Sequence, residues 1–453
     1  MRSLTFFFIV LLFLLTTGCW DSTAMERRAL VMNIGFDVGE EKPLALVLDI
    51  HNAKQSDANT MVGPPGALGP AVIAPRTEGT TIDECLEEQR RNMPRRIDFG
   101  LASAVVITED AAREGIFPYL SWIFFHPNVR NNSYVIVTST DLQKLFTEEA
   151  RVVEGTMGGA LLVSQLMADR KTAALTRVNL WEAYRIQLDG TGSLMVPFVR
   201  SQEGRIYYEG SAVFDGDRMI GLLDPDESAF VNIIAEERMP YLFTFDFIPP
   251  EVKENGQEDE QVPAVEERQE VQEEQTAEEQ VQEDSEEGSS PEKGHLAEGD
   301  REPKKEQKQS NGVEGRPERE GKMDVPDEEA SRMTLRFYRV QRSYDIEKIG
   351  SQQYEANIHV HFTGMLSDAN PPQVRYDRDD FDAMNEQAAQ ALEKKMQAVI
   401  EKIQKELKAD VLHLGRYVRP IDIREWEAMD WFDVYPEVTI NVSVTVRVLG
   451  ATR

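Results

Sequence analysis

The sequence predicts an α+β protein of several domains, in which mixed or antiparallel sheets are covered by helices and a long acidic insertion stays disordered. Three observations favour this class. Strand-like and helix-like patterns alternate over roughly the first 140 residues. One late segment shows strict strand alternation. The chain has 453 residues and 41% hydrophobic content, which is enough for two or three cores.

The N-terminal half shows strands and helices in alternation. Thr81 can cap a helix, and Glu84, three residues later, suits a capping box. Gly216 in Asp-Gly-Asp can take the positive φ of a tight hairpin. The expected elements are hairpin strands over 30–37 and 44–51, a loop over 62–80, a helix from Thr81 to about Pro94, a strand over 103–108, a helix over 110–125, a strand over 133–138, a helical stretch over 142–166, and hairpin strands over 206–214 and 218–223.

The C-terminal half contains the clearest helix and the clearest strand. Apolar residues recur at three- and four-residue steps from Phe381 to Leu407, which predicts a helix over 380–408 with one apolar face. Apolar and polar residues alternate from Val438 to Val448, which predicts a strand with one buried face, as in an antiparallel sheet. We expect the helix to lie on that face. Further strands are predicted over 335–339 and 355–362.

Residues 251–330 differ in kind from the rest. They hold 28 Asp and Glu and 10 Lys and Arg, so they supply −18 of the net charge of −31, and they contain no Phe, Tyr or Trp. Such a segment cannot bury enough apolar surface to offset the entropy of ordering, so we predict disorder. An acidic arm that keeps distance or holds cations is one interpretation. A tolerated insertion is the interpretation that we favour.

The chain opens on a short apolar stretch that ends in TTGCWD. The apolar run over 4–15 is shorter than the about 20 residues that cross a bilayer, and it fits a signal peptide over 1–18. Cys19 would then become the N-terminus. This resembles the bacterial lipobox, in which the cysteine is diacylated, although Thr16 stands where leucine is usual. We predict lipidation of Cys19; the alternative is a chance or buried cysteine after an uncleaved anchor.

Composition and motifs exclude several classes of function. A net charge of −31 argues against nucleic-acid binding, which needs clustered Lys and Arg. Only two cysteines occur, so a disulfide framework is excluded, and Cys85 among acidic neighbours is predicted to be a packed residue. The sequence has no Walker loop, GxSxG, HExxH or cysteine-pair metal motif. We predict no catalytic residue, no metal site and no cofactor.

A few polar groups could carry chemistry, and each has a plainer interpretation. His359 and His361 lie two apart on a predicted strand and point to solvent, where a metal would lack an evident third ligand. The acids within 377–382 suit helix capping by Asp379 or Asp380 better than catalysis.

Three further segments also have a functional and a structural interpretation. Trp426 and Trp431 flank a turn and are expected to cover a core rather than bind a ligand. Gly190-Thr191-Gly192 lacks the strand–turn–helix context of a dinucleotide loop. The loop over 126–132, HPNVRNN, is polar and rich in turn residues, which suits a recognition surface or an ordinary connection.

Several stretches together resemble the Ger(x)C family of spore-germination lipoproteins, the C subunits of GerA-type nutrient germinant receptors. The similarity covers nearly all of the chain except 251–330. The stretches are GCWD followed by a strand that ends in Gly35-Phe36-Asp37, TTIDECLEEQRRNMPRRIDFGLASAVVITEDAAREGI over 80–116, FFHPNVRNNSYVIVT over 124–138, GSAVFDGDRMIGLL over 210–223, and ADVLHLGRYVRP with YPEVTINVSVTVRVLG within 409–450.

The resemblance implies a three-domain body: an N-terminal domain over 19–204, and a C-terminal region over 205–250 and 331–453 that forms two domains. It also implies a lipid-anchored protein on the outer face of the cytoplasmic (inner spore) membrane. There it would act with integral membrane subunits of the A and B types and have no enzymatic activity. Only Cys19 is carried over as a functional residue.

Two hypotheses from other functional classes are alternatives to a receptor subunit. A solute-binding lipoprotein of a transporter would show two similar α/β lobes around a hinge. An exported hydrolase would need a nucleophile or an acid pair, which we do not find in the sequence.

Overall fold

The structure, a computed structural model, describes residues 27–51, 72–147, 172–203, 205–236, 238–249, 331–370 and 376–451. All of them belong to one of the two units into which the chain divides, and the other unit, Glu251–Glu329, lies outside them. Three predictions therefore concern residues outside the described part: the signal peptide over 1–18, the lipidation of Cys19, and disorder over 251–330.

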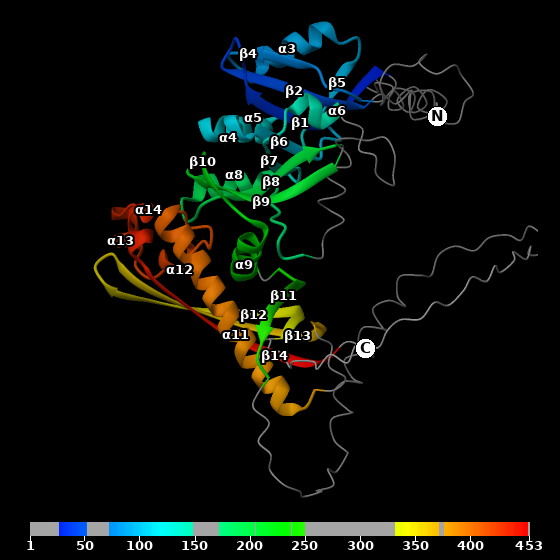
Figure 1. Ribbon diagram of the computed structural model, residues 1–453. Helices are drawn as coiled ribbons and strands as arrows, with labels where there is room; N and C mark the ends of the chain where they lie inside the picture. Colours follow the sequence, from blue (N-terminus) through cyan, green and yellow to red (C-terminus); the bar gives the residue numbers. More distant parts are fainter. Residues whose placement is uncertain are drawn as a thin grey trace, which may run out of the picture. The chain divides into compact units, whose positions relative to one another are not determined.

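The first sheet has ten strands, with a parallel centre flanked by antiparallel hairpins (Figure 1). The order is β10-β9-β8-β7-β6-β1-β2-β3, while β4 pairs with β2 and β5 with β1. β1, β6, β7 and β8 run parallel to one another. The bounds are β1 Arg28–Val38, β2 Leu44–His51, β3 Val72–Ile73, β4 Arg76–Gly79, β5 Arg96–Asp98, β6 Ala104–Thr108, β7 Tyr134–Thr138, β8 Met195–Gln202, β9 Arg205–Asp215 and β10 Arg218–Leu223.

Helices cover both faces of this sheet. One face, which includes Ile34 and Phe36 of β1, packs against α3, α4, α5 and α8. The other face, which includes Val47 of β2, packs against Phe146 of α6. The alternation of side chains along each strand divides the apolar residues between these two cores. The bounds are α3 Ile82–Asn92, α4 Glu109–Glu114, α5 Phe117–Phe125, α6 Leu142–Thr147 and α8 Leu180–Asp189.

Most predicted elements of this region are confirmed, and three differ. The helix predicted over 110–125 is two helices, because Gly115 takes a φ of 137° between α4 and α5. The loop predicted over 62–80 contains β3 and β4, which pair with β2. Thr81 caps α3 as predicted, but the Glu84 carboxylate accepts from the backbone N–H and the hydroxyl of Thr80 rather than from Thr81, so the capping box is not closed. Beyond α6, the helical stretch predicted to residue 166 lies outside the described residues.

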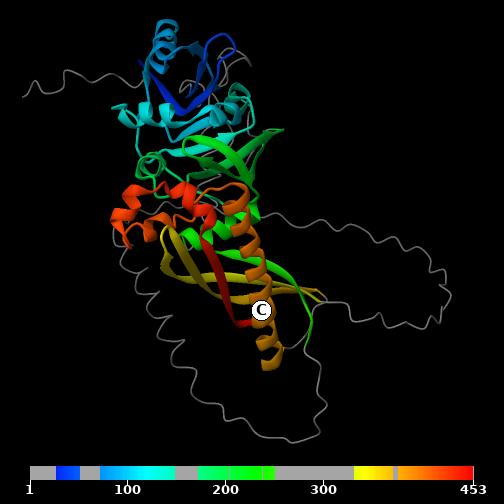
Figure 2. The same cartoon turned by 90° about the vertical axis from the view of Figure 1, so that its left-hand side faces the viewer.

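The second sheet has four strands in the order β11-β12-β13-β14, and helix α11 lies along it (Figure 2). β11, β12 and β13 are antiparallel, whereas β14 runs parallel to β13. The predicted alternation of β14 is confirmed, but the antiparallel neighbour is wrong. Alternation reports which face is buried and says nothing of the direction of the next strand. The bounds are β11 Tyr241–Phe247, β12 Ser331–Gly350, β13 Gln353–Asn370 and β14 Thr439–Ala451.

Helix α11, Arg378–Glu401, covers the apolar face of this sheet as predicted. Its N-cap is Asp377, and Asp380 closes a capping box with it, so the prediction of Asp379 or Asp380 as the cap is wrong by a few residues. Asn385 and Glu393 of α11 also accept hydrogen bonds from backbone N–H groups of β14. These side chains occupy donors that an edge strand would otherwise expose.

The described part is thus a mixed α/β protein with two sheets that helices cover. Strands β9 and β10, which we placed in the C-terminal region, continue the first sheet through β8. The boundary after residue 204 and the division into three domains remain predictions. No helix in the described ranges is both long enough and apolar enough to span a bilayer. The remaining helices in the described ranges are α9 Pro225–Glu236, the π-helical segment η3 Lys402–Glu406 that continues α11, α12 Gly415–Val418, α13 Ile423–Ala428, α14 Trp431–Val434 and the 3-10 segment η4 Tyr435–Glu437.

Candidate functional site

The two histidines weighed as metal ligands serve the second sheet instead. His359 and His361 lie in a shallow hollow on the face of β13 away from α11. Their Nδ1 atoms lie 2.6 and 2.7 Å from the hydroxyl oxygens of Ser443 and Thr445 on β14. Within the described ranges, no group of three His, Cys, Asp or Glu side chains could hold a metal ion. The hydrogen bonds to Ser443 and Thr445 instead join each histidine of β13 to the neighbouring strand β14.

A buried carboxylate in the C-terminal region also has structural partners. Asp410 is fully buried, and it accepts from the backbone N–H groups of Leu414 and Gly415 and from the indole N–H of Trp431. Burial raises the pKa of Asp410 to about 6. Trp431 is buried and Trp426 packs beside it, so the prediction that these rings cover a core is confirmed.

Two further candidates in the first region are structural as well. Cys85 is fully buried, and burial together with Glu84 raises the pKa of its thiol to about 11. A thiol in that state is a poor nucleophile, which confirms the prediction of a packed residue. Gly190 has a φ of 64° and ends α8, so it forms a helix C-cap.

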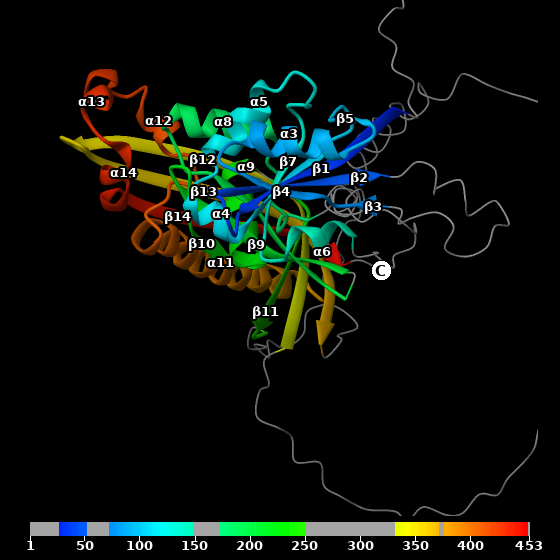
Figure 3. The same cartoon turned by 90° about the horizontal axis from the view of Figure 1, so that it is seen from above.

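The parallel strands of the first sheet have two ends, and these differ in chemistry. β1, β6 and β7 begin at one edge, which we call the amino edge, and end at the opposite carboxyl edge. β5 lies toward the amino edge and α4 toward the carboxyl edge (Figure 3). Open α/β sheets usually bind ligands beyond the carboxyl ends of their strands, so a ligand site would be expected at the carboxyl edge.

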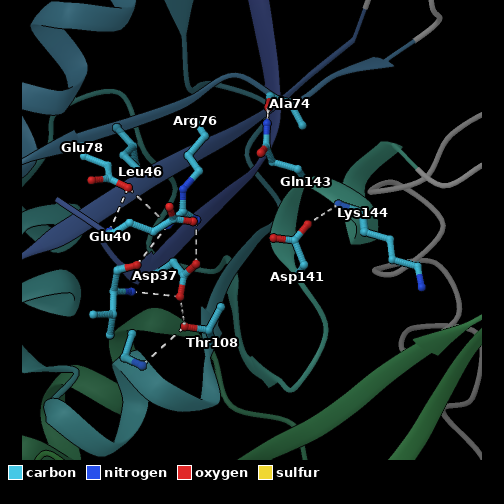
Figure 4. Close-up of polar contacts among 12 residues, drawn as sticks. Asp37, Glu40, Leu46, Ala74, Arg76, Glu78, Thr108, Asp141, Gln143 and Lys144 are labelled. Atoms are coloured by element: carbon cyan, nitrogen blue, oxygen red, sulfur yellow. Dashed lines mark hydrogen bonds and ion pairs between the residues drawn. The ribbon is translucent and has the colours of Figure 1, made fainter. Parts of the chain in front are cut away.

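Three side chains from three strands meet at the carboxyl edge (Figure 4). Arg76 Nη1 donates to Asp37 Oδ2 at 2.6 Å, and Thr108 Oγ1 donates to Asp37 Oδ1 at 2.6 Å. The side chains of Asp37 and Arg76 are only 17% and 18% exposed. Both carboxylate oxygens of Asp37 are therefore occupied. The cluster joins β1, β4 and β6, and its carboxylate, Asp37, is poorly placed to act as a catalytic base.

Glu78 of β4 fastens the turn between β1 and β2 at the same edge (Figure 4). Its carboxylate accepts from the backbone N–H groups of Glu40, Glu41 and Lys42 at 2.9, 2.8 and 3.3 Å. These hydrogen bonds lower the pKa of Glu78 to about 2. The carboxyl edge is thus acidic, and its central carboxylates, Asp37 and Glu78, accept hydrogen bonds from other groups of the chain.

Two loops and the first turn of a helix form the amino edge. The loop over 99–103 leads into β6, and the loop over 126–132 leads into β7. Ser133 Oγ donates to the carbonyl of Ala102 at 2.7 Å, which joins the two loops. The backbone N–H of Trp181, at the start of α8, donates to a carbonyl of the second loop at 3.0 Å. The segment predicted as a recognition surface or a connection therefore lies in the middle of this edge.

Aromatic contacts hold the second loop in place. The ring centroid of His126 lies 5.0 Å from that of Phe99 and 4.9 Å from that of Trp122. Burial lowers the pKa of His126, and the nearby Arg90 lowers it further, so both favour the neutral form of the ring. The loop thus rests on the apolar core.

Large apolar side chains stand exposed at this edge. Phe125 is 69% exposed, Trp181 is 50% exposed and Leu101 is 37% exposed. Phe125 ends α5 and contacts Tyr184 of α8, the helix that begins beside Trp181, whereas Leu101 lies on a loop. A single exposed apolar residue is ordinary, whereas several at one edge commonly mark a surface that contacts a partner.

The same edge is basic, in a chain whose net charge is −31. Arg28, at the start of β1, forms an ion pair of 2.7 Å with Asp98 of β5. Arg27, Arg95 and Arg96 adjoin that pair along the chain, and Arg130 lies in the loop over 126–132; of these, Arg95 is half-buried and the others are exposed. Aromatic residues and arginine are the types enriched in binding surfaces. We call the following residues the amino-edge surface: Leu101, Phe125 and Trp181, with Arg27, Arg95, Arg96 and Arg130.

Sequence reasoning found only part of this surface. Composition singled out the loop over 126–132, but Leu101 and Trp181 were missed because they join that loop only through the fold. One local signal was available. RRNMPRR over 90–96 concentrates four arginines in an acidic chain, and such a cluster indicates a site for anions.

Two family models match the chain. One, described as the N-terminal domain of a spore germination protein, matches residues 21–201. The other, described as spore germination B3/GerAC-like, C-terminal, matches residues 303–451. The first match contains both edges of the parallel strands, and the second contains β12, β13, β14 and α11.

A curated relative and a solved structure are also similar. YfkR of Bacillus subtilis (strain 168), whose name describes it as a spore germination protein, is 20% identical over 241 residues. That alignment covers 51% of this chain and 61% of YfkR, so the chain spans less than two thirds of this relative. A crystal structure of the GerBC protein is similar over 94% of this chain and 100% of its own, with 10% identity and a TM-score of 0.49.

Proposed function

Because the chain belongs to the GerAC family of spore germination proteins, we propose that it is the lipid-anchored subunit of a receptor for nutrient germinants. Diacylated Cys19 would hold the body on the outer face of the cytoplasmic (inner spore) membrane. There the body would assemble with integral membrane subunits of the A and B types. The observation that carries the proposal is the pair of family matches on a chain that opens with the lipobox-like TTGCWD.

The chemistry of the anchor supports a stable tether. Each buried CH₂ group contributes about 0.8 kcal/mol, so one acyl chain binds a membrane marginally and two hold firmly. Cys19 stands eight residues before Arg27, the first described residue (27 − 19). An extended connection of that length spans at most about 28 Å. An anchored body would therefore stay close to the bilayer.

The described side chains favour a binding role over catalysis. Asp37 is held by Arg76 and Thr108, and Asp410 by three N–H groups. The GerAC family is not known for enzymatic activity, which agrees with this reading. A solute-binding lipoprotein would show two similar lobes. The parallel-centred first sheet and the four-stranded second sheet are unlike, so nothing here favours that alternative.

Cysteine variants test the anchor directly. Cys19→Ala should abolish labelling by a clickable fatty-acid analogue and release the chain from the membrane fraction. Cys85→Ala is the matched control, because it removes the other of the two cysteines and should keep both label and membrane retention. Undiminished labelling of the Cys19 variant would refute the anchor.

Receptor function needs its own readout. Spores that lack this chain should lose the response to at least one nutrient, and cross-linking of the wild-type chain should capture A- and B-type subunits. An unchanged response to every nutrient tested, together with no captured subunit, would count against the receptor role even if Cys19 is lipidated.

A further inference from the structure

The amino edge is the side of the first sheet from which the chain would be tethered. Arg28, the first residue of β1, pairs with Arg96 at the start of β5, so the chain enters the sheet at this edge. Since β6 and β7 run parallel to β1, the loops over 99–103 and 126–132 lie at the same edge. A tether at Cys19 would therefore draw the amino edge toward the bilayer and leave the carboxyl edge facing away.

The apolar side chains of this edge suit the interface of a bilayer. Trp181 and Phe125 are at least half exposed, and Leu101 is more than one third exposed. Tryptophan gathers at the headgroup level of membranes because its ring is apolar and its N–H is polar. Phenylalanine and leucine bind there by burying apolar area at the boundary between headgroups and acyl chains.

The charges of the two edges would orient the body. Arg27, Arg96 and Arg130 are exposed at the amino edge. Glu40 and Asp110 are exposed at the carboxyl edge. Anionic headgroups attract arginines near the surface and repel acids within about a Debye length. The body thus presents its basic edge, in an otherwise acidic chain, on the side nearest to the tether.

We propose that the amino-edge surface docks on an anionic phospholipid bilayer, with Leu101, Phe125 and Trp181 at the headgroup level and the arginines on lipid phosphates. The proposal rests on the proposed function for the tether that brings this surface to the membrane. A lipid surface is favoured over a protein partner because basic charge, interfacial side chains and the entry of the chain coincide at one edge.

Quenching of tryptophan fluorescence by brominated lipids tests the contact. The full chain would carry Cys19→Ala and an N-terminal polyhistidine tag bound to nickel-chelating lipid, so that the tag supplies the tether. The part of the quenching that belongs to Trp181 is the difference between this chain and its Trp181→Phe variant. We expect Trp181 to be quenched on vesicles that contain phosphatidylglycerol, and much less on vesicles of phosphatidylcholine.

Charge variants separate lipid docking from general electrostatics. Arg96→Gln with Arg130→Gln should lower the ratio of docked to undocked chains about 25-fold, since each basic residue near an anionic surface is worth about fivefold. Arg332→Gln with Arg378→Gln is the matched control, because it removes the same charge from side chains that are 75% and 93% exposed in the C-terminal region. That pair should change docking less than about twofold.

Two results would overturn the proposal. One is an unquenched Trp181 on anionic vesicles, which is what a surface reserved for a protein subunit would give. The other is an equal loss of docking in both pairs of arginine variants. Because the tag replaces the lipid, a failure of Cys19 lipidation would leave this test unaffected, so the two proposals can fail separately.

Discussion

The two edges of the parallel strands in the first sheet use charge in opposite ways. At the carboxyl edge, the Asp37 carboxylate accepts hydrogen bonds from Arg76 and Thr108, so its charge is satisfied by partners within the fold. At the amino edge, Arg96 and Arg130 are exposed, and so are Phe125 and Trp181. The carboxyl ends of these strands are thus joined by internal hydrogen bonds, whereas their amino ends form an exposed surface.

This difference separates stability from binding. A charged side chain that is half-buried and hydrogen-bonded within the chain contributes to the free energy of unfolding, and removing one partner leaves the other desolvated. An exposed charge contributes little to stability because solvent screens it. Variants at the carboxyl edge should therefore change the free energy of unfolding, whereas variants at the amino edge should chiefly change binding.

The largest effect is expected for Asp37→Ala. This change removes the shorter of the two ion pairs of the Arg76 guanidinium, whose side chain is only 18% exposed, and leaves it Glu78 at 3.6 Å. It also removes the acceptor of the Thr108 hydroxyl. We expect the free energy of unfolding to fall by about 3 kcal/mol. Chemical denaturation followed by circular dichroism measures it.

Arg130→Ala at the amino edge is the paired control for that measurement. Arg130 is exposed, so its loss should change the free energy of unfolding by no more than about 0.5 kcal/mol. If the two variants lost equal stability, the distinction between a fastening edge and a binding edge would be wrong.

Features of the fold that depend on residues close in the sequence were mostly predicted, whereas features that depend on distant residues were missed. The start of α3 at Thr81 and the alternation of β14 depend on near neighbours, and both were predicted. The parallel direction of β14 and the pairing of β4 with β2 depend on distant segments, and both were missed. The break at Gly115 was missed although it is local, because the apolar pattern continues across it.

The same reasoning explains what was found of the candidate site. Arg76 and Thr108 are 39 and 71 residues away from Asp37, so no local pattern joins them. The amino-edge surface likewise gathers residues from separate segments. The polar loop over 126–132 was noticed because its composition is visible in one window. That Trp181 adjoins it could come only from the fold.

A smaller effect is expected for His126→Ala, which tests whether rings rather than charges hold the amino edge. The change removes two ring contacts, with Phe99 and Trp122, and should lower the free energy of unfolding by about 1–2 kcal/mol. Asn132→Ala, in the same loop but exposed, should have almost no effect. An equal loss in both variants, measured by thermal unfolding, would mean that the ring contacts do not hold the loop.

The pH dependence of His126 sharpens that test. Its pKa is lowered by burial and by Arg90 from the ordinary 6.5, so the unfolded chain binds the proton more readily. The stability linked to this ring is therefore present above pH 6.5 and is lost as the pH falls below it. The His126→Ala variant should lose this part of the pH dependence, which unfolding midpoints between pH 5 and 8 would reveal.

The smallest effect is expected for Glu78→Gln, and it should appear only at acid pH. The pKa of Glu78 is lowered from 4.5 to about 2 by the backbone N–H groups of Glu40, Glu41 and Lys42, so between these pH values the unfolded chain binds more protons. The stability from this carboxylate is present above about pH 4.5 and is lost as the pH falls toward 2. Glu78→Gln should flatten the fall of stability over that range.

Arg96→Gln provides the comparison, because a guanidinium stays protonated throughout this range and should leave the acid slope as it is in the wild type. Unfolding midpoints measured at several pH values between 2 and 5 would decide. An unchanged slope in Glu78→Gln would mean that the turn between β1 and β2 is held by its backbone alone. In that case the fastening at the carboxyl edge would reduce to the contacts of Asp37.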